Sequence, residues 1–105
     1  MTPEGKVEAH LKRRVRELGG EVRKLGWIGR ANAPDRLVML PYALHALRFS
    51  TKNGSLRHPL VELKAPGVKP SAAQLREHER LRNAGFTVLV LDSVEAVDLW
   101  FGPNK

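Results

Sequence analysis

Hydrophobic and polar positions repeat along this 105-residue chain with two periods, one typical of helices and one typical of strands. Residues 2–19 follow the helical period, and their apolar stripe consists of Val7, Leu11, Val15 and Leu18. Thr2 can cap this helix, Pro3 suits its first turn, and Gly19 with Gly20 ends it. The chain is therefore predicted to open with an amphipathic helix.

Short segments with strand patterns follow, in the ranges 21–28, 36–41, 59–64 and 86–92. The last is a near-continuous apolar run, as expected of a strand that is covered on both faces. Before it, Ser71 caps a predicted helix over residues 71–84, whose apolar positions are Ala72, Leu75, His78 or Glu79, and Leu81. Ser93 caps a short final helix. This order predicts an α/β fold, a mixed sheet with helices on both faces.

The segment from residue 60 to residue 90 reads as strand, helix and strand, which predicts a right-handed crossover between parallel strands. Residues 42–57 fit either a hairpin around Asn53 and Gly54 or a helical turn, and the pattern alone leaves both open. The length suits one domain, residues 1–105, with one hydrophobic core.

The chain carries more basic than acidic residues, which bears on the kind of partner it binds. Lys and Arg total 18 against 11 Asp and Glu, a net charge of +7, which favours nucleic acid as a partner over a role in solubility alone. The few aromatic residues do not interleave with the basic ones, so a stacking platform for single strands is poorly supported. The charge therefore indicates contacts to a nucleic-acid backbone.

Two further features bear on where the protein works. There is no cysteine, which excludes disulfides and zinc–thiolate sites and suits a reducing compartment. No apolar run approaches the ~20 residues of a membrane span, and the polar N-terminus is not a signal peptide. We expect a cytoplasmic protein with no membrane contact.

A small set of charged residues carries the candidate chemistry. Glu62 and Lys64 project to the same face of one predicted strand, and Asp35 stands at the start of the preceding one. If these strands are neighbours, the two carboxylates need a cation between them, and oxygen ligands favour Mg²⁺ or Mn²⁺. A nearby lysine can stabilise developing phosphate charge, or orient and deprotonate a water. The alternatives are an exposed Glu62–Lys64 ion pair and a turn role for Asp35.

The same residues lie within a longer set of motifs. The segments "APD" (33–35), "VELKAPG" (61–67) and "SAAQ" (71–74) closely resemble the VRR-NUC family. So do "TPEGKV" (2–7) and "GRANAPDRLV" (29–38), and the likeness spans nearly the whole chain. That family belongs to the PD-(D/E)XK nuclease superfamily. The resemblance implies a restriction-endonuclease-like core.

The resemblance also implies roles for individual residues. Asp35 and Glu62 would be metal ligands, and the main-chain carbonyl of Leu63 would complete the coordination. Lys64 would be the catalytic lysine, and Gln74 would reach back to the active centre from the first turn of its helix. Read alone, Gln74 is an ordinary helix-surface residue. No organic cofactor is implied.

A further carboxylate from the first helix is expected near the metal, and two residues are candidates. At about 100° per residue, Glu4 falls inside the arc of the apolar stripe and Glu8 falls at its edge. The family's "PE" opening favours Glu4, with Glu8 as second choice. The alternative for Glu4 is a first-turn residue favoured by the helix dipole.

Candidate contacts to DNA phosphates are Arg30, Arg36 and Lys69, for which the alternative is general surface charge. The histidines do not share a metal-ligand spacing, so we interpret them as structural or surface residues: His10, His45, His58 and His78.

One departure from the family pattern is the 26 residues between Asp35 and Glu62, which make residues 42–57 look like an insertion. It would shape substrate choice or build a subunit contact through its apolar residues, Leu44, Leu47 and Phe49.

The resemblance implies a metal-dependent, structure-selective DNA endonuclease of a bacterial or phage-infected cell. Stand-alone relatives of this size resemble Holliday-junction resolvases, which act as symmetric dimers. The alternatives are a monomeric nickase or flap endonuclease, and a catalytically silent DNA-binding module.

Overall fold

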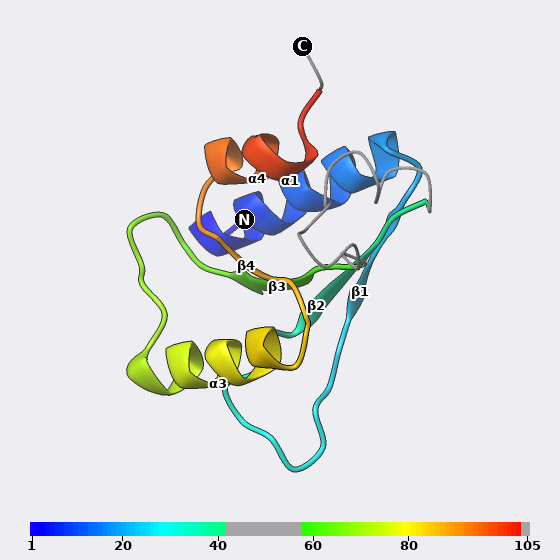
Figure 1. Cartoon of the computed structure of the whole chain (residues 1–105). Helices are drawn as coiled ribbons and strands as arrows, with labels where there is room; N and C mark the ends of the chain where they lie inside the picture. The colour runs from blue at the N-terminus through cyan, green and yellow to red at the C-terminus, as the bar shows by residue number, and fades with distance from the viewer. Residues whose placement is uncertain (42–57, 104–105) are drawn as a thin grey trace.

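The computed structural model describes residues 1–41 and 58–103. Within these ranges the elements in chain order are α1 (Pro3–Glu17), β1 (Glu21–Lys24), β2 (Arg36–Met39), β3 (Leu60–Leu63), α3 (Ala72–Asn83), β4 (Val88–Leu91) and α4 (Val94–Phe101). Figure 1 shows α1 and α4 side by side on one face of the sheet and α3 on the other. The predicted arrangement of helices on both faces is confirmed.

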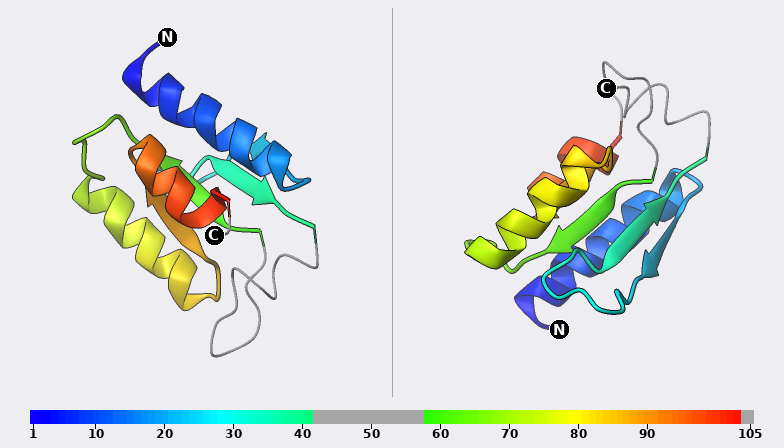
Figure 2. Two further views of the ribbon diagram at one scale, coloured as in Figure 1. Left: turned by 90° about the horizontal axis from the view of Figure 1, so that it is seen from above. Right: turned by 60° about the horizontal axis from the view of Figure 1, so that its bottom comes forward.

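The sheet of the described residues has four strands in the order β1-β2-β3-β4. β2 pairs antiparallel with both β1 and β3, whereas β3 and β4 are parallel. The parallel pair is joined through α3, so the predicted strand–helix–strand crossover is confirmed (Figure 2). The sheet is therefore mixed, as the sequence predicted.

The polar residues that precede each helix explain where the helices begin. The Thr2 hydroxyl accepts a hydrogen bond from the Gly5 N–H at 2.9 Å, and Pro3 occupies the first turn of α1. Ser93 accepts from the Ala96 N–H at the start of α4. α1 ends at Glu17, and Gly19 follows with a φ of +87°, a conformation that glycine adopts without strain.

The sheet separates two apolar clusters of unequal size. The larger lies between the sheet and α1 with α4, and consists of Val7, Leu11, Val15, Val38, Leu40, Val61, Leu63, Leu89, Leu91, Val97 and Phe101. The smaller lies on the α3 side, where Leu60, Leu81 and Val88 are buried. Because side chains alternate along β3, Val61 and Leu63 face the large cluster while Leu60 and Glu62 face α3. The thinner cluster leaves room for polar groups on that side.

Several expected details differ. β1 ends at Lys24 instead of continuing to residue 28, because the chain turns away and the indole of Trp27 bonds to the backbone of Pro34. Leu75, expected in the core, is 51% exposed because it lies on the outer side of α3. The alternatives for residues 42–57, with Leu44, Leu47 and Phe49, lie outside the described residues. Within the described ranges, no helix combines the length and apolar character needed to cross a membrane.

Candidate active site

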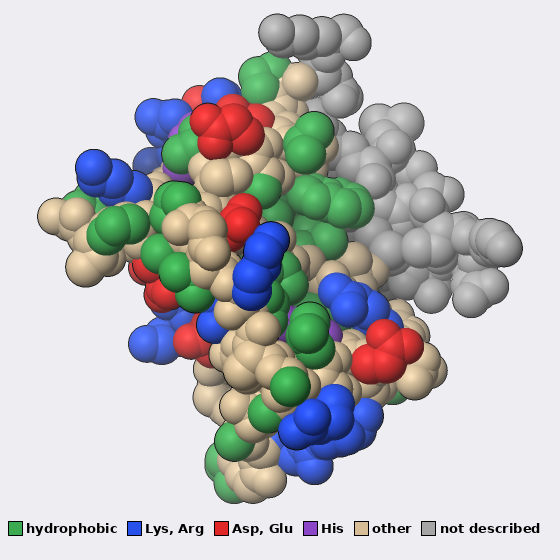
Figure 3. Space-filling model, turned by 90° about the vertical axis from the view of Figure 1, so that its left-hand side faces the viewer, with side chains coloured by type: hydrophobic (Ala, Val, Ile, Leu, Met, Phe, Trp, Pro, Cys, Tyr) green, Lys and Arg blue, Asp and Glu red, His purple; other side chains and the backbone are tan. Residues whose placement is uncertain are grey.

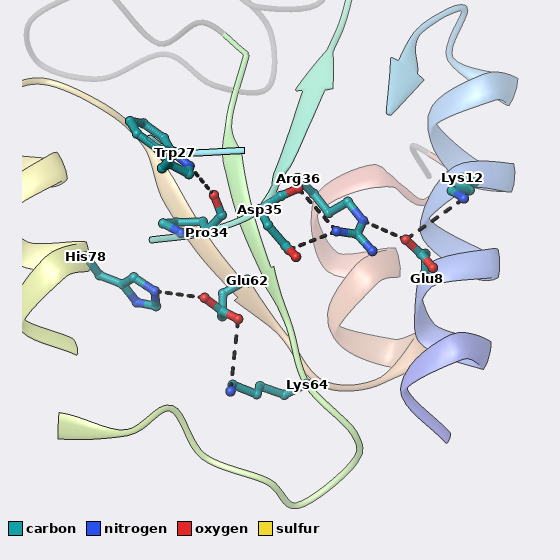
Figure 4. Close-up of polar contacts among 9 residues, drawn as sticks. All are labelled: Glu8, Lys12, Trp27, Pro34, Asp35, Arg36, Glu62, Lys64 and His78. Atoms are coloured by element: carbon teal, nitrogen blue, oxygen red, sulfur yellow. Dashed lines mark hydrogen bonds and ion pairs between the residues drawn. The ribbon is translucent and has the colours of Figure 1, made fainter. Parts of the chain in front are cut away.

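The antiparallel register brings Asp35 and Glu62 together. Arg36 is paired with Val61 and Leu37 with Leu60, so the position before Arg36 lies opposite Glu62. Residues opposite each other in an antiparallel pair project to the same face. The two carboxylates therefore share the α3 face of the sheet, at the end where β2 begins and β3 ends (Figure 4).

Lys64 lies on the same face as Glu62, two residues along the chain. Its Nζ is 4.0 Å from Oε2 of Glu62, and the two side chains are only 16% and 11% exposed. This degree of burial excludes the alternative of a solvated ion pair on an open sheet face. A buried pair of this kind costs desolvation energy, which marks the position as a candidate functional site.

The surroundings of Glu62 disfavour its charged form. Burial is the largest cause that raises the pKa of this carboxyl, and the negative charges of Asp35 and Glu4 raise it further. The ammonium of Lys64 acts in the opposite direction and lowers the pKa of Glu62. A cation placed among these carboxylates would relieve the repulsion between them.

Hydrogen bonds to the loop between β1 and β2 hold Asp35 in place. The indole N–H of Trp27 donates to the carbonyl of Pro34 at 2.8 Å, and the N–H of Leu25 donates to the carbonyl of Asp35 at 2.8 Å. Pro34 is fully buried, whereas the Asp35 side chain is 49% exposed. The backbone is thus fixed while the carboxylate remains accessible. Trp27 was expected in the strand over residues 21–28, and its pattern gave no sign of this role.

Arg36 points to the other face of the sheet, toward α1. Its Nε donates to Glu8 at 2.6 Å, and one terminal nitrogen lies 2.9 Å from a carboxylate oxygen of Asp35 (Figure 4). The hydrogen bond from Arg36 lowers the pKa of Glu8. With a side chain only 12% exposed, Arg36 supports the site from within, which differs from the surface position expected for a phosphate contact.

The two candidate carboxylates of α1 have different environments. Glu8 is held by Arg36, with Lys12 3.9 Å away. Glu4 is exposed, contrary to its expected place in the buried stripe, because the first turn of α1 extends past the edge of the sheet (Figure 2). Its charge nevertheless acts on Glu62. The choice of Glu4 over Glu8 as a site carboxylate stays a prediction.

His78 is a residue of the site whose role the sequence analysis missed. It is fully buried on α3, and its Nε2 lies 3.4 Å from Oε1 of Glu62 (Figure 4). Burial lowers the pKa of His78, so the neutral imidazole protonated at Nε2 can donate to the carboxylate. Its Nδ1 has no hydrogen-bond partner among the described residues. A polar residue in the apolar stripe of the predicted helix was the available signal.

Two other histidines have structural contacts. His10 Nε2 lies 2.8 Å from Asp98 between α1 and α4, and the N–H of Leu40 donates to Nδ1 of His58 at 3.4 Å. These positions agree with the structural interpretation. His45 lies outside the described residues.

Gln74 caps α3 in this structure. Its side-chain oxygen accepts from the Ser71 N–H at 2.9 Å, and the Ser71 hydroxyl accepts from the Gln74 N–H at 3.1 Å. This reciprocal pair is a capping box, which begins the helix that carries His78. A direct role for Gln74 at the active centre stays a prediction.

The remaining predicted DNA contacts lie on the surface. Arg30 is 48% exposed in its side chain, and one terminal nitrogen donates to Glu77 at 2.5 Å. Lys69 is exposed in the turn that precedes α3. Both are placed where a nucleic-acid backbone can reach them.

The donor chemistry of the site suits a hard divalent cation, because Asp35, Glu62 and Glu4 offer only carboxylate oxygens. In the part of the chain that the structure describes, no three His, Cys, Asp or Glu side chains are arranged to hold a metal ion. Asp35 is instead turned toward Arg36. The residues therefore have the right ligand atoms for a divalent cation. In this structure their side chains form ion pairs with basic residues.

Comparisons with known proteins agree with this site. No protein-family model matches the chain. The chain is 46% identical over 90 residues to "Putative nuclease p44" of Acyrthosiphon pisum secondary endosymbiont phage 1, covering 86% of this chain and 83% of that protein. A solved structure described as "VRR_NUC domain" is 42% identical with a TM-score of 0.75, and the match covers 94% of each chain. The expected restriction-endonuclease-like core is confirmed, and the chain belongs to the VRR-NUC family of nuclease domains.

Proposed function

We propose that this chain is a divalent-metal-dependent, structure-selective DNA endonuclease formed by one domain over residues 1–105. The proposal rests above all on the register of β2 and β3, which sets Asp35, the residue directly before β2, opposite Glu62. Lys64 Nζ lies 4.0 Å from Glu62. A strongly basic chain that carries this arrangement suits the hydrolysis of a polyanion.

The cation is proposed to be Mg²⁺ or Mn²⁺, held by Asp35 and Glu62 with the main-chain carbonyl of Leu63 and with Glu4. When bound, such an ion neutralises charge on a phosphodiester and lowers the pKa of a coordinated water. The raised pKa of Glu62 supports this assignment, since a cation would favour its ionised form.

The chain's own residues would divide the remaining work. The Lys64 ammonium donates hydrogen bonds to the scissile phosphate, where negative charge develops, or to the attacking water. His78 orients the Glu62 carboxylate, and Trp27 with Leu25 fixes the backbone on which Asp35 stands. In-line attack by water would leave a 5′-phosphate and a 3′-hydroxyl.

Specificity in this proposal comes from the shape of the DNA and from contacts to its backbone. We propose a Holliday-junction resolvase-like homodimer as the working form. A four-way junction has two equivalent strands to cut, so two active sites related by a twofold axis match it. The name of the phage relative, which specifies a nuclease, is compatible with this assignment.

The decisive experiment incubates labelled four-way junctions, flaps, nicked duplexes and linear DNA with the protein in Mg²⁺, Mn²⁺ or EDTA. We expect metal-dependent cutting that is strongest on the junction and is abolished by Lys64→Ala. Preferred cutting of flaps or nicking by a monomer, with sedimentation as the readout of subunit number, would replace the resolvase proposal. Binding without cutting in any metal would identify a silent DNA-binding module.

A further inference from the structure

A polar pocket lies between the β1–β2 loop and α3. Its walls carry Arg30 and Asn32 from the loop and Arg76, Glu77 and Arg80 from the helix, and its volume is about 240 Å³. Figure 3 shows Lys and Arg side chains gathered at the bottom of the molecule, the level at which Figure 1 places α3 and this loop. The pocket belongs to neither the Asp35–Glu62 pair nor the sheet.

The charges of the pocket are unbalanced toward the positive. Three guanidinium groups face one carboxylate, that of Glu77, which is buried at the contact between loop and helix. A single oxygen of Glu77 accepts from Arg30 at 2.5 Å and from Arg80 at 3.3 Å. Each guanidinium has five N–H donors, so both arginines retain donors that Glu77 does not use. Glu77 thus orients two arginines and leaves several of their N–H donors available to a ligand.

The size and lining of the pocket select the class of ligand. Its volume falls below the roughly 300–1,000 Å³ that is usual for organic ligands. None of the residues that line it is aromatic, so it offers no surface on which a base could stack. Guanidinium groups match the oxygens of a phosphate group in geometry and in charge. The pocket is therefore suited to one phosphate group.

The loop and the helix that form the pocket also carry residues of the proposed active site. Asn32 precedes Asp35 by three residues, and at 3.8 Å per residue their Cα atoms are at most about 11 Å apart. That span corresponds to about three steps of 3.4 Å along the axis of a duplex. On the helix, Glu77 is followed by His78, which contacts Glu62. A strand in the active site would thus pass close to the pocket.

We infer that this pocket binds a backbone phosphate of the DNA, displaced by one to three nucleotides from the phosphate that is cut. The inference rests on the proposed function for the identity of the ligand. Arg30 and Arg80, pre-oriented by Glu77, grip the phosphate oxygens together with Arg76, and Asn32 closes the pocket from the loop side. The pocket fixes the register of the strand in the active site, which is a positioning role.

The test measures DNA binding in EDTA, so that it does not depend on cutting. Arg76→Gln combined with Arg80→Gln is compared with Arg16→Gln, which removes an exposed arginine of α1 that is remote from the pocket in sequence. We expect the double variant to lose affinity roughly three- to tenfold per arginine and to lower the salt slope by about one per lost contact. Arg76→Gln alone is the safeguard for folding, because that arginine is exposed.

The specific readout is a set of DNA substrates, each with one phosphate replaced by a neutral methylphosphonate. At one position the replacement should weaken binding of the wild type and of Arg16→Gln several-fold, yet leave binding of the double variant unchanged. Equal effects on all three proteins at every position would overturn the inference. If inorganic phosphate binds the pocket arginines and no methylphosphonate position is coupled to them, the pocket serves a free phosphate and the DNA assignment is wrong.

These results are separable from the fate of the proposed function. A protein that binds DNA through the pocket but cuts nothing in any metal would retain this inference and lose the endonuclease proposal. A protein that cuts normally, but whose pocket arginines are coupled to no phosphate position, would retain the endonuclease proposal and lose this inference.

Discussion

The Nε2 atom of His78 lies 3.4 Å from one carboxylate oxygen of Glu62, while Lys64 Nζ lies 4.0 Å from the other. The crossover helix α3 and the strand β3 thus each contribute one neighbour to the same buried carboxylate. A neutral donor on one side and a cation on the other fix the direction in which Glu62 points. The orientation of this carboxylate depends on the packing of α3 against the sheet.

Replacing His78 should lower the Mn²⁺ affinity of the site in addition to lowering the stability of the protein. His78→Ala removes a fully buried ring and should cost about 2–4 kcal/mol in the free energy of unfolding, measured in urea. Leu81→Ala, a buried position on the same helix, is the matched control with a similar cost. Only His78→Ala should also weaken Mn²⁺ binding, measured by titration calorimetry. Equal Mn²⁺ affinities in the two variants would show that His78 serves packing alone.

The stability of the metal-free protein should respond to pH at Glu62. Because the folded protein raises the pKa of Glu62 above its usual 4.5, the folded state holds this proton to higher pH than the unfolded state does. Ionisation of Glu62 therefore lowers the free energy of unfolding. This loss is absent below pH 4.5 and is complete once the pH exceeds the raised pKa. Glu62→Gln should therefore match the wild type near pH 4 and be more stable at pH 8 in thermal unfolding.

The control for this effect is Glu79→Gln, which neutralises an exposed carboxylate of α3. A variant at Glu62 that is less stable than the wild type at pH 8 would contradict the sign of the predicted shift.

Removal of either paired carboxylate should abolish cutting and leave DNA binding largely intact. Asp35→Ala and Glu62→Ala remove metal ligands in the proposed mechanism, and loss of a negative charge near phosphate can even tighten binding. Mn²⁺ at 100 times its dissociation constant should stabilise the wild type by about 2.7 kcal/mol and stabilise neither variant. Gel binding assays, cutting assays and thermal unfolding measure the three effects. Cutting at the normal rate by either variant rules out the metal assignment.

Glu4 and Glu8 should separate into a site residue and a structural residue. Glu8→Gln removes one of the two carboxylates that pair with the largely buried Arg36 and should cost about 1–2 kcal/mol of stability. Glu4→Gln changes an exposed side chain, so it should leave the free energy of unfolding unchanged while reducing Mn²⁺ affinity. Denaturant unfolding and metal titration of both variants test this division. The reverse pattern would make Glu8 the carboxylate of the site.

DNA binding should weaken steeply with salt, because each phosphate contact releases condensed counterions. The slope of log affinity against log salt is expected to be about −0.9 for each phosphate contacted on duplex DNA. Fluorescence anisotropy between 50 and 200 mM salt, a range over which counterion release is readily resolved, measures it. A flat response would contradict the argument from the net charge of +7.

The helices and strands could be predicted from the amino-acid sequence, because each is specified by residues that are neighbours in the chain. Thr2, Ser71 and Ser93 cap helices as expected, since a cap bonds to a backbone group three residues away. The alternation along β3 placed Glu62 and Lys64 on one face. The motif around Asp35 supplied the third residue, and its resemblance identified the family that the comparisons confirm.

The contacts that those residues make could not be predicted in this way, because they depend on how distant segments pack together. Arg36 reaches Glu8 across 28 residues of sequence, and Arg30 reaches Glu77 across 47. The contact of His78 with Glu62 and the bond from Trp27 to Pro34 likewise join separate elements. Periodicity indicated the buried face of each helix but placed Glu4 and Leu75 on that face, although both are exposed. It also does not show what a face contacts, since that depends on how helices pack against the sheet. The physical division is therefore between local backbone preference and long-range packing.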